Sequence, residues 1–133
     1  MKVYVAKLKR PSPKPTCVYK VGITRYTDAL KRLTYRGDDE RFPISNYFND
    51  IKVMKTIKVD TLEEAEAIEQ FIMQTIGKGS KFHNWYEKDQ ISGITEMRVW
   101  DYNEFKTVCE LMDSYKNYPL FEQVLKEIHE NQP

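Results

Sequence analysis

Apolar and polar residues alternate along two stretches of the chain, and a third stretch is a short apolar run broken by one glycine; together they predict three β-strands. The strands are expected at residues 2–9, 17–24 and 51–59. Three prolines fall within residues 11–15, between the first two strands. Because proline cannot donate a backbone hydrogen bond, this segment is expected to be an extended turn. The first two strands should therefore form an antiparallel hairpin with a long loop.

A spacing of three and four residues between apolar positions predicts helices elsewhere in the chain. The clearest is residues 61–76, where Thr61 and Glu64 form a capping box and Gly77 or Gly79 ends the helix. Weaker patterns predict a short helix at 28–35, loops at 36–49 and 80–93, a further strand within 96–101, and helices at 103–115 and 119–130. The order of elements indicates an α/β chain of the α+β class. We expect a small, mainly antiparallel three-stranded sheet flanked by helices.

The composition is that of a soluble globular domain. The chain has 133 residues, of which 31% are charged and 41% hydrophobic. No apolar run approaches the roughly 20 residues that span a bilayer, so we expect no membrane association. Lys7, Lys9 and Arg10 interrupt any secretory pattern near the first residue, and Cys17 and Cys109 lack metal-ligand spacing. These features favour a reducing, cytoplasmic location.

Charge is distributed unevenly along the chain. Residues 1–59 hold 14 lysines and arginines against 5 acidic residues, while residues 60–133 hold 7 against 15. A basic half beside an acidic half indicates a phosphate-facing surface on the N-terminal elements. The alternative is that the C-terminal helices simply carry more glutamates.

Glu69 is the polar residue whose position on a helix is hardest to explain by solubility alone. In the 61–76 helix it follows Leu62 by seven residues, which places the two within about 20° on the helical wheel. The apolar stripe that it joins consists of Leu62, Ala65, Ile68, Ile72 and Ile76. A carboxylate in or beside a core is costly unless it pairs, accepts hydrogen bonds or binds a metal. The alternative is an edge glutamate that reaches solvent or meets a lysine.

Two short strand sequences carry a resemblance to a known family. The first is Lys2-Val3-Tyr4, and the second is Tyr19-Lys20-Val21-Gly22-Ile23-Thr24. Together they resemble the signature strands of the GIY-YIG nuclease superfamily, in particular its phage-type branch, over roughly residues 2–86. The resemblance implies a GIY-YIG-like nuclease domain at residues 1–90, with residues 91–133 as a strand and helical extension packed on it. It also implies a metal-dependent endonuclease that hydrolyses phosphodiester bonds of nucleic acid, most readily double-stranded DNA.

The family's functional residues map onto four positions of this chain. The resemblance implies that Glu69 holds a Mg²⁺ or Mn²⁺ ion, that Arg32 neutralises charge on the phosphate, and that Tyr4 orients the attacking water. Lys20 stands where many members have a tyrosine. Either Lys20 takes a role in the site, or Tyr4 acts without its usual companion.

A second group of residues is expected to contact nucleic acid. Arg25 and Arg36 lie within about 40° of Arg32 on an extended helical wheel, where their guanidinium groups could bind phosphates. The other expected contacts are Tyr19, Gly22 and Asn84. Gly22 would either admit the substrate close to the backbone or mark a bulge.

Two further interpretations stay open. The chain could be a GIY-YIG-like module that binds nucleic acid or protein without cutting, with its C-terminal helices forming a homodimer or partner surface. It could also be a small α/β protein whose hairpin imitates the motif. The nuclease interpretation requires Tyr4, Arg32 and Glu69 to converge beside Gly22.

Overall fold

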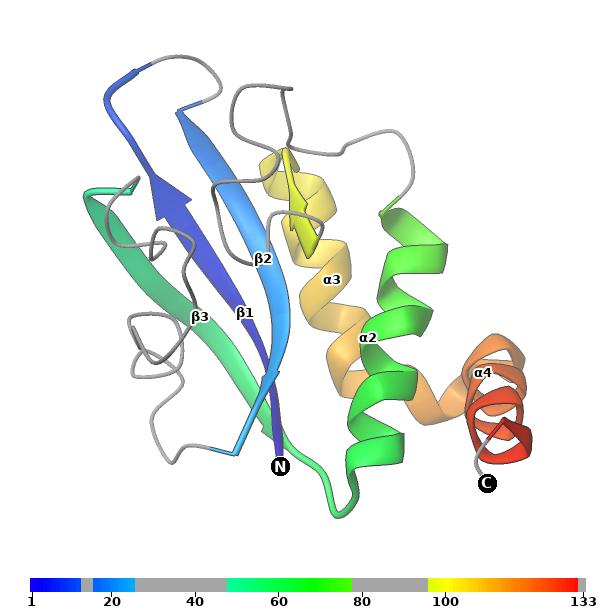
Figure 1. The fold of residues 1–133 in the computed structure, drawn as a ribbon. Coiled ribbons are helices and arrows are strands. Elements are labelled where there is room, and N and C mark those ends of the chain that lie inside the picture. The colour runs from blue at the N-terminus through cyan, green and yellow to red at the C-terminus, as the bar shows by residue number, and fades with distance from the viewer. Residues whose placement is uncertain (13–15, 26–47, 78–95, 132–133) are drawn as a thin grey trace.

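The computed structural model describes residues 1–12, 16–25, 48–77 and 96–131. Within these ranges the chain forms one antiparallel sheet of four strands together with three α-helices, so the predicted α+β class is confirmed. The prediction of three strands was wrong by one. Figure 1 shows the sheet with α2 and α3 lying along one side of it.

The strands follow the order β3-β1-β2-β4 across the sheet. Their bounds are Lys2–Lys9 for β1, Cys17–Thr24 for β2, Asp50–Lys58 for β3 and Met97–Arg98 for β4. β1 and β2 pair antiparallel without a register shift, so the predicted hairpin is confirmed. The fourth strand falls within residues 96–101 and pairs with β2 at only two positions.

A shift in register divides β3 between the two faces of the sheet. Val5 pairs with Lys55 but Ala6 pairs with Val53, so Met54 is an extra residue on β3. In a regular strand, every second residue points to the same face of the sheet. Because of the extra residue, Val53 packs with the cluster on one face and Ile57 with the cluster on the other. Simple alternation predicts the strand but not this change of face.

The helices begin and end close to the predicted positions. α2 covers Leu62–Ile76, where the Thr61 hydroxyl accepts a hydrogen bond from the Glu64 amide at 3.1 Å and Gly77 follows the last turn. α3 covers Tyr102–Ser114 and continues into a 3₁₀ turn, η3, at Tyr115–Asn117. α4 covers Pro119–Glu130. The short helix expected at 28–35 lies outside the described residues.

The main core lies between the sheet and the helices. Its buried members come from the same face of β1 and β2, from α2, and from the elements after β4. Leu62 was expected in the apolar stripe of α2 but is 38% exposed, and Phe71 is buried there as well. We call this region the helix–sheet core; it includes Val3, Val5, Tyr19, Val21, Ala65, Ile68, Phe71, Ile72, Trp100, Phe105, Val108, Met112, Tyr115 and Phe121.

A second, smaller cluster covers the opposite face of the sheet. It contains Tyr4, Ala6, Leu8, Val18, Phe48 and Met97. The two clusters show that the sheet is apolar on both sides. The opposite face therefore also buries side chains, although no described helix covers it in Figure 1.

β4 and the residue two positions beyond it fix the end of α2. The Arg98 guanidinium donates from Nε to the Gly77 carbonyl oxygen at 2.8 Å, and the Trp100 indole donates to the Ile76 carbonyl oxygen at 3.2 Å. These carbonyls lack partners within the helix, and a cation at a helix C-terminus also interacts favourably with the helix dipole. α2 is thereby tied to the edge of the sheet beside β2.

The C-terminal elements belong to the same core as the N-terminal strands. β4 pairs with β2, and Phe105 of α3 and Phe121 of α4 are members of the helix–sheet core. The boundary expected near residue 90 lies outside the described residues. Along the parts of the chain that are described, no helix is both long enough and apolar enough to cross a membrane.

Candidate functional site

Tyr4 and Gly22 face each other across β1 and β2 and are in close contact. They are register partners in the hairpin, and a Cβ atom built on Gly22 would overlap the hydroxyl end of the Tyr4 ring. The glycine therefore makes room for a side chain of the protein. The expectations that Gly22 admits substrate or marks a bulge do not match this placement, because Tyr4 fills the space and β1 and β2 pair regularly around it.

Lys20 lies on the same face as Tyr4. Its Nζ is 5.8 Å from the centre of the Tyr4 ring, a distance at which an ammonium is attracted to an aromatic face. Lys20 is half-buried, whereas Tyr4 is only 2% exposed. Of the two groups, Lys20 is therefore the one that a ligand could reach directly.

Glu69 on α2 is half-buried, as the helical wheel predicts. Its pKa is raised to about 7, mainly by burial; the positive charge of Lys20 lowers the pKa, and the nearby charges of Glu96 and Glu66 raise it. A carboxyl group with a pKa near 7 is unusual and is typical of functional sites, although structural networks also produce such shifts. The Lys20 ammonium lies near the Tyr4 ring, and its charge lowers the pKa of Glu69. Lys20 therefore links the hairpin to α2 electrostatically.

Glu96 is a member of this site that the sequence did not single out. It directly precedes Met97, the register partner of Lys20 on β4. Its Oε2 atom is buried and makes no hydrogen bond in the described structure. Nothing in the sequence marks Glu96, because its proximity to Glu69 depends on the pairing of a two-residue strand. We call Tyr4, Lys20, Gly22, Glu69 and Glu96 the Tyr4–Glu69 cluster.

The donor atoms of this cluster fit a small divalent ion. Mg²⁺ is usually held by one or two carboxylates and keeps several waters. Glu69 and Glu96 offer two carboxylates, and the buried Glu96 oxygen without a hydrogen-bond partner is the kind of atom that a cation would satisfy. Among the described residues, no group of three or more histidine, cysteine, aspartate or glutamate side chains could hold a metal ion. The fit is therefore to a largely hydrated ion.

Tyr19 lies in the helix–sheet core rather than beside Lys20. Its ring stacks on Phe105 with the centroids 4.8 Å apart and lies 6.2 Å from Trp100, and the residue is 5% exposed. Burial raises the pKa of its hydroxyl. The expected contact with nucleic acid does not match this position, because Phe105 occupies a face on which a base would stack.

The remaining expected residues are placed only in part. Arg25 is exposed and follows β2 directly, so its side chain is accessible to a ligand. Arg32, Arg36 and Asn84 lie outside the described residues. Tyr4, Lys20, Gly22 and Glu69 are thus the predicted site residues that the structure brings into one region.

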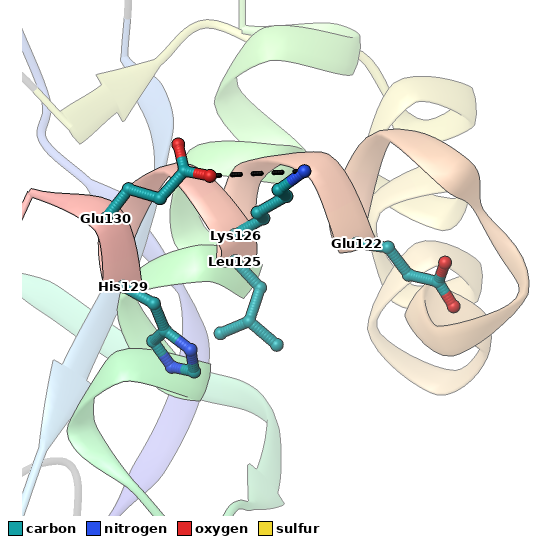
Figure 2. A pocket seen from close by; sticks show the side chains of 5 residues that line it. All are labelled: Glu122, Leu125, Lys126, His129 and Glu130. Carbon is teal, nitrogen blue, oxygen red and sulfur yellow. Dashed lines mark ion pairs between the residues drawn. The ribbon is translucent and has the colours of Figure 1, made fainter.

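A separate hollow of about 400 Å³ lies on the outer side of α4. It is lined by Glu122, Leu125, Lys126, His129 and Glu130, and Figure 2 shows these side chains along a single helix. Lys126 and Glu130 form an ion pair at 3.9 Å. None of these residues belongs to the Tyr4–Glu69 cluster, so this hollow is not the candidate site.

Comparison with known proteins adds no identification. No protein-family model matches the chain, and no curated protein or solved structure matches it. The candidate function therefore rests on the residues and their geometry.

Proposed function

We propose that the chain is a metal-dependent endonuclease of the GIY-YIG type, which hydrolyses phosphodiester bonds in nucleic acid, with double-stranded DNA as the expected substrate. The observation that supports this proposal best is the Tyr4–Glu69 cluster. The carboxyl of Glu69 is half-buried, has a pKa of about 7 and interacts electrostatically with Lys20, whose ammonium lies near the Tyr4 ring. Arg32 would complete the site from outside the described residues.

Lys20 is the group in the cluster best suited to bind phosphate. An ammonium in a partly buried position interacts more strongly with an anion than one in bulk water does. Its location over Tyr4 limits the directions in which the side chain can extend. We therefore assign phosphate binding to Lys20, the residue that stands in place of the family's second tyrosine.

Tyr4 has a positioning role in this proposal. A phenol that is 2% exposed and packed against Gly22 has little access to an attacking water. It does offer Lys20 an aromatic face and fixes the spacing of β1 and β2. This differs from the role that the resemblance implies, in which tyrosine acts on the water.

Glu69 is suited to exchange a proton or hold a cation near neutral pH, because its pKa is about 7. Glu69 and Glu96 are the residues that would hold Mg²⁺ or Mn²⁺. When bound, such an ion would polarise a phosphate oxygen and stabilise the leaving oxygen.

The test is a plasmid-nicking assay with Mg²⁺ or EDTA, comparing the natural chain with Glu69→Gln and Lys20→Met. We expect nicking only with the metal, and we expect each variant to lose about 100-fold or more in rate. Glu110→Gln on the exposed side of α3 is the matched control and should cut normally. Full activity of Glu69→Gln would refute the proposal.

A binding module without catalysis is the second candidate. The lysine in place of the second signature tyrosine and the burial of Tyr4 favour it. In that case the natural chain would bind duplex DNA in a mobility-shift assay and nick no plasmid with Mg²⁺ or Mn²⁺.

A further inference from the structure

The strand β4 has only two residues, so backbone pairing alone does little to fix its place in the fold. Its residues Met97 and Arg98 pair with Lys20 and Tyr19 of β2. Two paired positions allow only a few hydrogen bonds between the strands. The position of β4 relative to α2 therefore depends on side-chain contacts, and the Arg98 side chain, in a residue that is 7% exposed, makes the closest of them.

The Arg98 guanidinium joins β4 to the end of α2. Its Nε atom donates to the Gly77 carbonyl oxygen and its Nη1 atom donates to the Met97 carbonyl oxygen, both at 2.8 Å. A guanidinium is planar and holds its N–H groups in a fixed arrangement, so the two bonds together fix the direction from β4 to the end of α2. The Trp100 indole adds a bond to the Ile76 carbonyl oxygen at 3.2 Å.

The end of α2 and Glu69 move together. Glu69 lies eight residues before Gly77 in the same helix and its cap. This separation is about 12 Å along the helix axis. Backbone hydrogen bonds join each turn of an α-helix to the next, so a rotation or shift of the last turn also moves Glu69. The bond from Arg98 to Gly77 therefore helps to set where Glu69 lies relative to the sheet.

Glu96 lies at the other end of the same link. It is two residues before Arg98, and the charges of the two side chains attract each other. Glu69 interacts electrostatically with Glu96 and with Lys20 of β2. The segment around β4 thus carries both Glu96 and the residue that holds α2. One short segment therefore places both carboxylates of the Tyr4–Glu69 cluster.

We propose that Arg98 is a positioning residue, which holds α2 on β4 and so keeps Glu69 beside Glu96 and Lys20. The Arg98 guanidinium is buried and bonds to backbone carbonyls, so its role is to place the cluster rather than to contact a phosphate. The expected effect on cleavage rests on the proposed nuclease function, whereas the expected effect on the placement of Glu69 does not.

The first test is a double-variant cycle on stability, measured by urea denaturation at pH 8 with EDTA. Arg98→Met removes both guanidinium bonds and is combined with Glu69→Gln. In the natural chain, Glu69→Gln should raise the folding equilibrium constant, because it removes a charge from a half-buried position. In the Arg98→Met background this gain should be about fivefold smaller, because Glu69 is no longer held away from water.

The sign of the coupling separates positioning from a direct charge effect. If Arg98 acted only through its positive charge, its loss would leave Glu69 beside Glu96 without compensation, and Glu69→Gln would gain more. Tyr115→Phe is the matched control, because it removes a 2.7 Å bond from the Tyr115 hydroxyl to Glu64 in the first turn of α2. A gain that is unchanged or larger in Arg98→Met, or equally reduced in Tyr115→Phe, would overturn the proposal.

Trp100→Phe is a milder second variant that decides the question if Arg98→Met does not fold. It removes the indole bond to the Ile76 carbonyl oxygen and keeps an aromatic ring near Tyr19. The gain from Glu69→Gln should fall about twofold in this background. If Arg98→Met is unfolded and the gain is unchanged in Trp100→Phe, the proposal is wrong.

A second measurement concerns cleavage and uses plasmid nicking with Mg²⁺. Arg98→Met should lower kcat about tenfold or more with little change in KM, because a displacement of about 1 Å in a catalytic group can cost 100-fold in rate. Arg98→Lys, which keeps the charge and one donor, should recover part of kcat, and Tyr115→Phe should cut normally.

The two measurements distinguish failure of this proposal from failure of the proposed function. If the natural chain nicks no plasmid, the nuclease proposal fails, while the stability cycle still decides the role of Arg98. If the natural chain nicks plasmid and Arg98→Met keeps its full kcat, the positioning role is refuted and the nuclease proposal stands.

Discussion

The helix–sheet core and the Tyr4–Glu69 cluster lie close together in the molecule but differ in what they bury. The core is filled with aliphatic and aromatic side chains. The ring of Phe121 packs against those of Phe71 and Tyr115, and the ring of Phe71 also packs against Tyr118, with ring centroids 4.7–6.3 Å apart. The cluster buries part of a lysine and parts of two glutamates beside a tyrosine.

The difference indicates where stability is gained and where it is lost. Burying apolar surface stabilises the fold, whereas burying charge costs free energy unless each charge finds a partner. Burial raises the pKa of Glu69 to about 7, which is a direct sign of this cost. Regions that lower stability in this way are frequently functional sites, because the same properties prepare them for binding and catalysis.

The largest expected effect is in the helix–sheet core. Phe71 is 1% exposed and its ring lies near Tyr118 and Phe121. Phe71→Ala should lower the free energy of unfolding by about 4 kcal/mol, because it leaves a cavity. Urea denaturation measures this, with Tyr102→Ala, at a position 67% exposed, as the control. A loss similar to that of the control would mean that α2 is not anchored through this residue.

The next effect tests the close contact in the cluster. Gly22→Ala should cost about 2 kcal/mol, because the new methyl group overlaps the Tyr4 ring. Adding Tyr4→Leu removes the overlapping atoms, so the double variant should lose less stability than the sum of the two single variants. Additive losses in urea denaturation would show that the two residues do not share this space.

The third prediction concerns pH and tests the buried charge directly. In the metal-free protein, the folded state raises the pKa of Glu69 from 4.5 to about 7, so the folded state binds its proton more tightly than the unfolded state does. The contribution of Glu69 to stability is therefore fully present below pH 4.5 and is lost as the pH rises through 7.

Glu69→Gln should remove this loss. With EDTA present, the natural chain should lose on the order of 2 kcal/mol relative to the variant between pH 4.5 and pH 8. Denaturation curves at several pH values measure the difference. A difference that stays constant with pH would show that the Glu69 carboxyl is not desolvated.

The smallest effect concerns a polar contact at the edge of the core. The Tyr115 hydroxyl donates to Glu64 Oε1 at 2.7 Å, and burial together with this carboxylate raises the pKa of Tyr115 well above its usual range. Tyr115→Phe should cost about 1 kcal/mol. Tyr102→Phe provides the exposed control, and equal thermal unfolding of both variants would contradict a stabilising role for this bond.

Much of the fold was predictable because local patterns decide it. The bounds of β1 follow from alternation, those of β2 from a short apolar run, and Thr61 with Gly77 marks the ends of α2. β4 was predicted only as part of residues 96–101, because two residues carry too little pattern to define a strand. The change of face in β3 was missed, since an extra residue in one strand is visible only against its partner.

The site was predictable where one residue contradicted its surroundings. Glu69 interrupts the apolar stripe of a helix, so its partial burial could be inferred from spacing. Tyr19 and Lys20 are adjacent in the sequence and lie on opposite faces, which the alternation of a strand requires. The sequence did not indicate that Tyr19 would pack against Phe105 while Lys20 would lie beside Tyr4, because this depends on how the helices pack on the sheet.

The sequence by itself determined β1, β2, β3, the three described helices and the position of Glu69 on α2, because these depend on the chemistry of residues that are near neighbours in the chain. Only the tertiary structure decided that Tyr4 fills the space above Gly22, that Glu96 adds its charge near Glu69, and that Lys7 lies opposite Lys52. These contacts join residues far apart in the sequence. Their geometry follows from strand register and helix packing, which no local pattern specifies.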